Sequence, residues 1–285
     1  MRLFVSKRPE VIGGGSNTFA CNFTVWAKRN GHTIVPRMEL AERAIVIAHL
    51  AEEADLKRAR ANGCYITHRI DEYFEANEDE YRRRKHAKII ALNRYADVTV
   101  FQSQFTYHNA YPFVRPRRHE IILNGGDARV FHPARQPGEF IGHVTWGVGD
   151  RKRLDLLYQK ILETPNERFW LIGRHRESGY EFRLPNVVLR GVKDRKQICK
   201  EYWKMKLLFF PSENEPCSNI PIEAILSGVP VCYSDTGGTP EVVRDCGEPP
   251  KRFDYLLNHL EEYRQRCLRR EDLHFDSVMK KYMTI

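Results

Sequence analysis

Long apolar runs are missing from this sequence, and none approaches the roughly 18 residues that a membrane-spanning helix needs. The seven cysteines are scattered without a Cys-x-x-Cys pair, which argues against a zinc site or a disulfide framework and for reduced thiols. The N-terminal stretch MRLFVSKRP lacks the apolar core of a secretion signal and predicts a first strand. We therefore expect a cytoplasmic protein, soluble or peripheral at a membrane.

Acidic residues are too few to balance the basic ones, and the formal net charge is +9. Such a charge calls for an anionic partner. Basic residues cluster at 82–86 (RRRKH) and 115–119 (RPRRH), where they could form solvated faces or meet an anionic membrane or a phosphorylated acceptor. Because no motif of a known nucleic-acid-binding module accompanies this charge, we expect no nucleic-acid partner.

The length of 285 residues is too great for one ordinary core and predicts two domains. Short apolar runs alternate with helical patterns in both halves, which predicts an α/β protein with parallel sheets. We place the first domain at 1–135, the second at 136–255 and a charged helical segment at 256–285. The expected strands are 3–6, 33–35, 44–48, 64–67, 98–102 and 120–123, then 140–146, 169–173, 187–192, 207–211 and 229–233.

Within residues 211–243, Glu215 and Glu223 lie on either side of a predicted loop-to-helix junction. Pro221 suits a first helical turn, so Glu223 is expected in that turn. The free N–H groups of residues 218–220 would point out of the helix end, where the helix dipole favours an anion such as a phosphate. This junction is therefore a candidate ligand site.

A glycine turn at 235–238 follows the predicted strand 229–233, and its backbone can approach a ligand closely. Ligands of open α/β sheets bind beyond the carboxyl ends of the strands, and both polar loops lie on that side. A plainer interpretation is also open. Glu223 could only stabilise its helix, Glu215 could be solvated, and the glycines could form only a turn.

The first half has a glycine run at 13–15, between a predicted strand and a helix that begins near Asn17. With Ser16 or Asn17 as N-cap, this geometry would bring N–H groups to a phosphate. A plain tight turn would explain the glycines equally well.

Three further polar residues, His68, Arg69 and Asp71, follow the predicted strand 64–67. That is the end of a strand at which ligands gather. The three side chains could also merely pair with each other.

The pattern in 211–243 resembles the donor site of the retaining GT-B glycosyltransferases of family 4, the glycosyl transferases group 1. Their motif is Glu, seven residues, Glu, an alanine-containing helix, Gly-x-Pro-Val and Gly-Gly-x-x-Glu. The resemblance implies a GT-B fold, with two Rossmann-like domains whose parallel sheets face each other across a cleft, and a C-terminal helix packing back on the N-terminal domain. The matching positions here are Glu215, Glu223, Ala224, Gly228, Pro230, Val231, Gly237, Gly238 and Glu241.

The resemblance also implies roles for individual residues. Glu223 would accept hydrogen bonds from the ribose hydroxyls, and Glu215 would hold hydroxyls of the donor sugar near the reacting carbon. Lys152 would neutralise the leaving diphosphate, and His68 would reach the donor sugar. The other expected donor contacts are Gly14, Gly15, Arg151, Val192, Cys217, Ser218, Asn219, Ile220, Gly237 and Gly238, with Arg69 and Asp71 on the acceptor side.

The sequence departs from the family pattern in two respects. The family's arginine is missing at its usual place, where Trp146 or Gly147 falls, and Arg151 or Arg153 could replace it. The first domain is also shorter than is usual. The resemblance covers nearly the whole chain, densely in 186–245 and loosely before residue 140.

By resemblance, the protein is a metal-independent retaining hexosyltransferase of the EC 2.4 class. It would move a sugar from a UDP- or GDP-linked donor to a hydroxyl of a glycan, glycolipid or glycoprotein. We see no Asp-x-Asp loop and expect no metal and no prosthetic group. An inactive nucleotide-sugar-binding protein is the alternative. A glycoside hydrolase would also use two carboxylates, but it would not need phosphate-facing glycines and cations.

Overall fold

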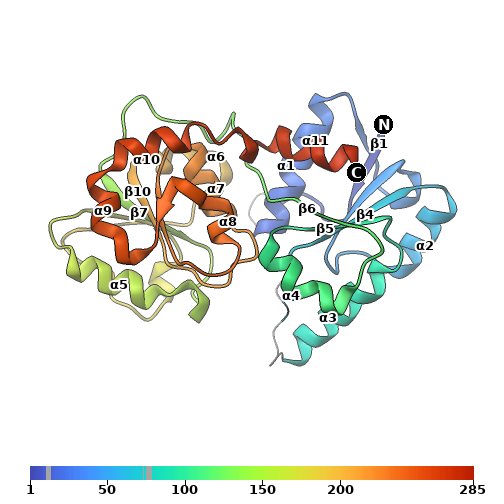
Figure 1. Cartoon of the computed structure of the whole chain (residues 1–285), viewed down its shortest axis with the longest axis horizontal. Coiled ribbons are helices and arrows are strands. Elements are labelled where there is room, and N and C mark those ends of the chain that lie inside the picture. Colours follow the sequence, from blue (N-terminus) through green and yellow to red (C-terminus); the bar gives the residue numbers. More distant parts are fainter. Residues whose placement is uncertain (11–13, 73, 75–78) are drawn as a thin grey trace. The chain divides into compact units, whose positions relative to one another are not determined.

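The computed structural model describes residues 1–10, 14–72, 74 and 79–285 (Figure 1). Contacts divide the chain into two compact units. Unit 1 comprises Met1–Asn124 and Val278–Ile285, and unit 2 comprises Gly125–Ser277. Each unit contains one six-stranded sheet, and every strand pair that is described is parallel. The predicted α/β class with two parallel sheets is confirmed.

The sheet of unit 1 has the strand order β2-β1-β3-β4-β5-β6. Its central strands are buried on both faces because helices cover them, as parallel sheets require. This is why the chain shows short continuous apolar runs rather than alternation. The strands are β1 (Arg2–Val5), β2 (Thr33–Ile34), β3 (Arg43–Ile47), β4 (Tyr65–Ile70), β5 (Val98–Phe101) and β6 (His119–Ile121), and the helices are α1 (Gly15–Arg29), α2 (Glu53–Ala61), α3 (Glu80–Asn93) and α4 (Gln104–Val114).

The last residues of helix α11 (Phe275–Thr284) belong to unit 1. The Tyr282 ring lies 5.6 Å from the Phe19 ring of α1. The guanidinium of Arg43 donates to the carbonyls of Tyr282, at 3.3 Å, and of Ile285, at 3.0 Å. Aromatic contact and carbonyl capping together fix this C-terminal end against α1 and β3.

The sheet of unit 2 has the order β12-β11-β10-β7-β8-β9, so the chain turns outward in both directions from the pair β7 and β10. Such a reversal point opens a crevice at the carboxyl ends of the two strands. The strands are β7 (Phe140–Thr145), β8 (Phe169–Gly173), β9 (Val187–Gly191), β10 (Met205–Phe210), β11 (Val231–Tyr233) and β12 (Gly247–Glu248), and the helices are α5 (Leu154–Glu163), α6 (Arg195–Tyr202), α7 (Asn219–Leu226), α8 (Thr239–Val243), α9 (Phe253–Asn258) and α10 (Leu260–Cys267).

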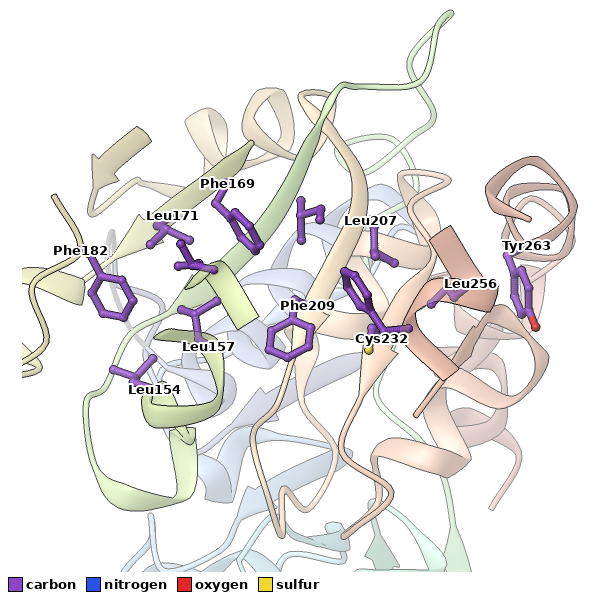
Figure 2. Close-up of a cluster of buried hydrophobic side chains, with 13 residues drawn as sticks. Leu154, Leu157, Phe169, Leu171, Phe182, Leu207, Phe209, Cys232, Leu256 and Tyr263 are labelled. Carbon is purple, nitrogen blue, oxygen red and sulfur yellow. The ribbon is translucent and has the colours of Figure 1, made fainter. Parts of the chain in front are cut away.

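One cluster of buried apolar side chains holds the strands of unit 2 to its helices (Figure 2). Leu157 and Ile161 of α5 join this cluster together with Phe169 of β8 and Phe209 of β10. Burying a side chain of this size stabilises the fold by about 1.5–3 kcal/mol. The cluster therefore fixes the strands whose carboxyl ends carry the polar loops.

No helix within the described residues is both long and apolar enough to span a bilayer. The contacts also group residues 125–135 and 256–277 with unit 2.

Candidate functional site

Three loops leave the carboxyl ends of β7, β10 and β11 and are tied together by backbone hydrogen bonds. The N–H of Glu213 donates to the Arg151 carbonyl at 2.8 Å, which joins the loop after β10 to the loop after β7. The N–H of Gly238 donates to the Glu215 carbonyl at 2.8 Å, which joins the loop after β11 to the same segment. The sheet's reversal point therefore carries one connected loop cluster.

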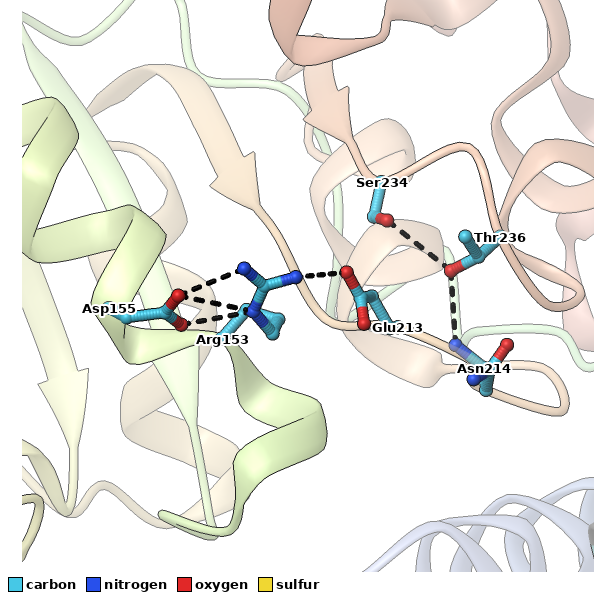
Figure 3. Close-up of polar contacts among 6 residues, drawn as sticks. All are labelled: Arg153, Asp155, Glu213, Asn214, Ser234 and Thr236. Atoms are coloured by element: carbon cyan, nitrogen blue, oxygen red, sulfur yellow. Dashed lines mark hydrogen bonds and ion pairs between the residues drawn. The ribbon is translucent and has the colours of Figure 1, made fainter. Parts of the chain in front are cut away.

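The glycine turn after β11 is needed for this close approach. Gly237 has φ +67°, and a Cβ there would lie 2.7 Å from the backbone nitrogen of Glu215 and 2.8 Å from its backbone carbonyl oxygen. Only glycine fits both the backbone angle and the space. Nearby, the N–H of Asn214 donates to Thr236 Oγ1 at 3.1 Å, and Ser234 lies 3.3 Å from the same hydroxyl (Figure 3).

Two predicted site residues meet in this cluster. Lys152 Nζ lies 2.5 Å from Glu215 Oε1, and the two side chains are 26% and 18% exposed. Lys152 ends a short 3₁₀ helix after β7, and Glu215 lies in the loop after β10. The parallel sheet places a cation and a carboxylate, 63 residues apart in the chain, side by side at its carboxyl edge.

Arg153 clamps the same two loops. Its guanidinium donates to both oxygens of Asp155, at 2.9–3.3 Å, and forms an ion pair with Glu213 (Figure 3). The hydrogen bonds that Arg153 donates to Asp155, together with the charges of Asp155 and Glu213, raise the pKa of Arg153, which stays charged. Because its charge is already matched by two carboxylates, Arg153 is better suited to positioning than to replacing the family's arginine. The predicted contact of Arg151 with the donor stays a prediction.

Helix α7 begins at Asn219, with Ser218 as its N-cap. Glu223 is therefore the fifth helical residue, and the prediction that it lies in the first turn is wrong. The reason is that the Ser218 side chain caps the helix, accepting from the Ile220 N–H at 3.4 Å, so the helix begins before Pro221. The interpretation of Glu223 as a first-turn acid that stabilises its own helix loses its basis.

Glu223 instead interacts with a tyrosine that the sequence analysis missed. The hydroxyl of Tyr202, at the end of α6, donates to Glu223 Oε2 at 3.0 Å and also lies 3.4 Å from the Ile220 carbonyl. Tyr202 is completely buried, and burial together with the charge of Glu223 raises its pKa well above 10. Tyr202 therefore stays a neutral donor. The sequence around Tyr202 contains no motif that could have revealed this contact.

The backbone of the predicted phosphate loop lies at the start of α7. Cys217 is 5% exposed, and Ser218, Asn219 and Ile220 follow it at the helix N-terminus. Val192, by contrast, lies just beyond β9 and is 42% exposed. Their predicted contacts with phosphate and base stay predictions.

In unit 1 the glycine loop is described only in part, because Gly13 lies outside the described residues. Gly14 is the N-cap of α1 and Gly15 its first residue, so the expectation that Ser16 or Asn17 caps the helix is wrong. The Asn17 side chain is used elsewhere: its Oδ1 accepts from the Glu10 N–H at 2.7 Å, and its amide donates to the Glu10 carbonyl at 3.0 Å. The predicted phosphate contacts of Gly14 and Gly15 stay predictions.

His68 lies inside β4 rather than after a strand, because β4 extends to Ile70. Its Nε2 donates to the Ala48 carbonyl at 2.8 Å, and its Nδ1 accepts from the Asn93 amide at 2.9 Å. Complete burial lowers the pKa of His68 to about 4, so the ring is neutral. To reach a donor sugar, the His68 ring would have to break both of these hydrogen bonds. The observed contacts instead favour a function in which His68 holds Ala48 and Asn93 in position within unit 1.

Arg69 and Asp71 pair with each other, as the plainer interpretation held. Arg69 Nη1 lies 2.9 Å from Asp71 Oδ2, and Nη2 donates to Asn124 Oδ1 at 2.9 Å. The guanidinium also lies 4.3 Å from the centre of the Phe19 ring, and the Arg69 side chain is 1% exposed. Strand β4 continues through Arg69 to Ile70 because the partners of Arg69 are inside the unit.

Among the described residues, no group of three or more His, Cys, Asp or Glu side chains is placed to hold a metal ion.

Comparison with known proteins found one family model that matches part of unit 2 and solved structures that match nearly the whole chain. Residues 139–249 match the family model described as glycosyl transferases group 1. No curated protein matches the sequence. The structure of Anabaena Alr3699/HepE in complex with UDP has a TM-score of 0.74 at 13% identity, covering 99% of this chain and 98% of that one.

Two other solved structures show the same architecture. The complex of Anabaena Alr3699/HepE with UDP-glucose has a TM-score of 0.71 at 12% identity and covers 100% of this chain and 99% of that one. Sucrose-phosphate synthase (tll1590) of Thermosynechococcus elongatus has a TM-score of 0.63 at 15% identity, covering 92% and 75%. The chain therefore has the GT-B fold of glycosyltransferases. Its second unit holds the segment that matches the group 1 family.

Proposed function

We propose that this protein is a retaining glycosyltransferase that moves a hexose-type sugar from a UDP- or GDP-linked donor to a hydroxyl of a glycan, glycolipid or glycoprotein. The observation that carries the proposal is the pairing of Glu215 with Lys152 at the reversal point of the unit 2 sheet, inside the segment that matches group 1 glycosyl transferases. We further propose that the protein works in the cytoplasm, peripherally at an anionic membrane through the basic residues of its first half.

In the proposed reaction, the acceptor hydroxyl attacks the anomeric carbon on the face that the diphosphate leaves. The bond from that carbon to the diphosphate oxygen breaks, and the departing diphosphate takes the hydroxyl proton. Lys152 and the N–H groups at the start of α7 stabilise the charge that develops on the diphosphate. Since a lysine supplies this charge, the proposal includes independence from metal ions.

The two glutamates have different functions in this proposal. Glu215 accepts hydrogen bonds from hydroxyls of the donor sugar, and Lys152 beside it can shift from Glu215 to the diphosphate. Glu223 accepts from the ribose hydroxyls, since one carboxylate can accept several hydrogen bonds. Neither carboxylate acts as a nucleophile, and the two together do not act as an acid–base pair.

A panel of UDP- and GDP-sugars in a thermal-shift assay tests the proposal. A bound donor stabilises the folded state, by about 2.7 kcal/mol at a concentration 100 times its Kd, and we expect at least one to raise the melting temperature. The HepE structures contain UDP and UDP-glucose, which supports UDP-linked donors as the first to try. If no donor in the panel raises the melting temperature, the proposed function is wrong. If a donor does bind, measuring the transfer of its sugar to water or to an acceptor distinguishes an enzyme from an inactive binding protein.

Tyr202→Phe tests whether the buried phenol positions Glu223. The change keeps the ring packed and removes one hydrogen bond to a carboxylate, a bond of about 1.5–3 kcal/mol. We expect KM for the donor to rise about tenfold with kcat nearly unchanged, because ribose contacts are the same in the ground and transition states. Steady-state kinetics at saturating acceptor measures both constants.

The matched control is Tyr263→Phe. Tyr263 is also buried in unit 2 and also donates from its hydroxyl to a glutamate, Glu248. This pair lies between β12 and α10 and outside the loop cluster. If both variants raised KM equally, the effect would be one of general packing, and the positioning function of Tyr202 would be lost.

A further inference from the structure

Unit 1 contains a cavity of about 520 Å³ that the proposed reaction does not use. Its lining includes four cations, Lys57, Arg60, Arg94 and Arg117, with Tyr95 and the single carboxylate Asp97. We call this cavity the basic pocket. Four positive charges and one negative charge give the residues that line the pocket a net charge of +3.

The basic pocket lies at the amino ends of two neighbouring strands. Residues 94–97 lead directly into β5, Arg117 lies just before β6, and Lys57 and Arg60 come from α2. Arg69 and Asp71 lie at the other end of the same sheet, beyond which ligands of α/β proteins usually bind. Four residues of β5 span about 13 Å, so the basic pocket is separate from that edge.

The carboxylate in the pocket is already used within the fold. Asp97 Oδ1 accepts from Arg60 at 2.7 Å, and its Oδ2 accepts from the Ile66 N–H at 2.7 Å. The Tyr95 carbonyl also accepts from Arg60, at 3.0 Å. Arg60 is therefore held in a fixed orientation at the pocket wall.

The other cations are less compensated. Lys57 pairs with Glu53 at 3.0 Å, and Glu53 also accepts from the Tyr95 hydroxyl at 2.6 Å. The side chains of Arg94 and Arg117 are exposed and make no hydrogen bond or ion pair within the described part of the chain, although the charge of Arg94 acts on Glu53. Like charges gathered in a concavity create a positive potential that draws an anion.

We propose that the basic pocket binds a phosphate-bearing group, carried by a soluble metabolite or by the headgroup of an anionic lipid. Guanidinium groups match the oxygens of a phosphate with pairs of parallel hydrogen bonds, and three of the four cations are arginines. The cavity volume lies within the usual range for small-molecule sites, about 300–1,000 Å³. Arg117 belongs to the predicted basic cluster at 115–119, so the phosphate-bearing group would be the anionic partner of that cluster. This binding is independent of the donor site in unit 2.

The double variant Arg94→Glu/Arg117→Glu tests the proposal in the full-length protein. Calorimetric titration with inorganic phosphate and with glycerol 3-phosphate probes a soluble ligand. Sedimentation with vesicles of phosphatidylcholine, with and without phosphatidylglycerol, probes a lipid headgroup. We expect wild-type protein to bind one of these probes and the variant to lose at least about tenfold in affinity, because each basic residue contributes about fivefold. Binding of soluble phosphates assigns a metabolite, and binding of phosphatidylglycerol vesicles alone assigns a lipid.

The control Arg135→Glu/Arg269→Glu makes the same change of charge at exposed arginines of unit 2 and should bind like wild type. Arg94→Gln/Arg117→Gln removes the charge without reversing it, in case the first variant does not fold. The proposal is overturned if wild type binds none of the probes, or if the control loses as much affinity as the pocket variant. Nucleotide-sugar binding should be unchanged in every variant, so failure of the donor panel would leave this result standing.

Discussion

Glu215→Gln should lower kcat by about two to three orders of magnitude while leaving the affinity for the nucleotide nearly unchanged. Removing one preorganised group that acts at the reacting centre commonly costs 10²–10³ in turnover. Glutamine keeps the size of the side chain but loses the charge that pairs with Lys152. In the proposed function, that charge also accepts hydrogen bonds from the sugar hydroxyls. Single-turnover transfer and calorimetric binding of the free nucleotide separate the two effects.

Glu213→Gln is the matched control for this experiment. Glu213 lies two residues away on the same loop, is similarly half-buried and also forms an ion pair, with Arg153. Its loss should loosen the loop and lower the melting temperature with a much smaller effect on kcat. Equal losses of turnover in both variants would mean that the loop needs its ion pairs only for stability, and Glu215 would lose its place at the reacting centre.

Much of the fold was predictable because strands of a parallel sheet are buried on both faces. Residues 207–210 (LLFF) and 43–47 (RAIVI) are apolar almost throughout. They lie in the central strands β10 and β3. The loop after β10 was predictable for a local reason, since Ser, Asn, Pro and Glu follow one another there. Local composition therefore located the strand ends that carry Glu215.

Contacts between distant residues were not predictable from composition. Lys152 and Glu215 were each expected at a ligand site, but no local pattern says that their charges touch. Tyr202 and Glu223 are brought together by the packing of α6 beside α7, which depends on the whole unit. Long-range pairs of this kind are fixed by tertiary structure rather than by any stretch of sequence.

The error at His68 and Arg69 has the same origin. Polar side chains usually mark the end of a buried strand, because an unpaired polar group is costly to bury. Here Asn93 and Asn124 supply the hydrogen bonds, so β4 continues through both residues. The sequence shows the polarity but not the partners that neutralise it.

Glu223→Ala should weaken binding of the nucleotide that the donor panel selects by about 100-fold. In the proposed function, the change removes two hydrogen bonds from the ribose to the carboxylate, each worth about 1.5–3 kcal/mol before the ligand regains water. The change also leaves the Tyr202 hydroxyl without the carboxylate in a buried site, which should cost about 1–3 kcal/mol of stability. Calorimetric titration gives the Kd, and a thermal melt gives the stability.

The two effects can be separated with variants that the fold itself provides. Glu248→Ala removes the carboxylate partner of the buried Tyr263 and should lower stability without changing the Kd for the nucleotide. Tyr202→Phe/Glu223→Ala should bind no more weakly than Glu223→Ala alone, because the phenol acts only through the carboxylate and the two changes are not additive. If Glu223→Ala bound the nucleotide like wild type and only melted earlier, Glu223 would be a structural partner of Tyr202, and the ribose would have to be held elsewhere.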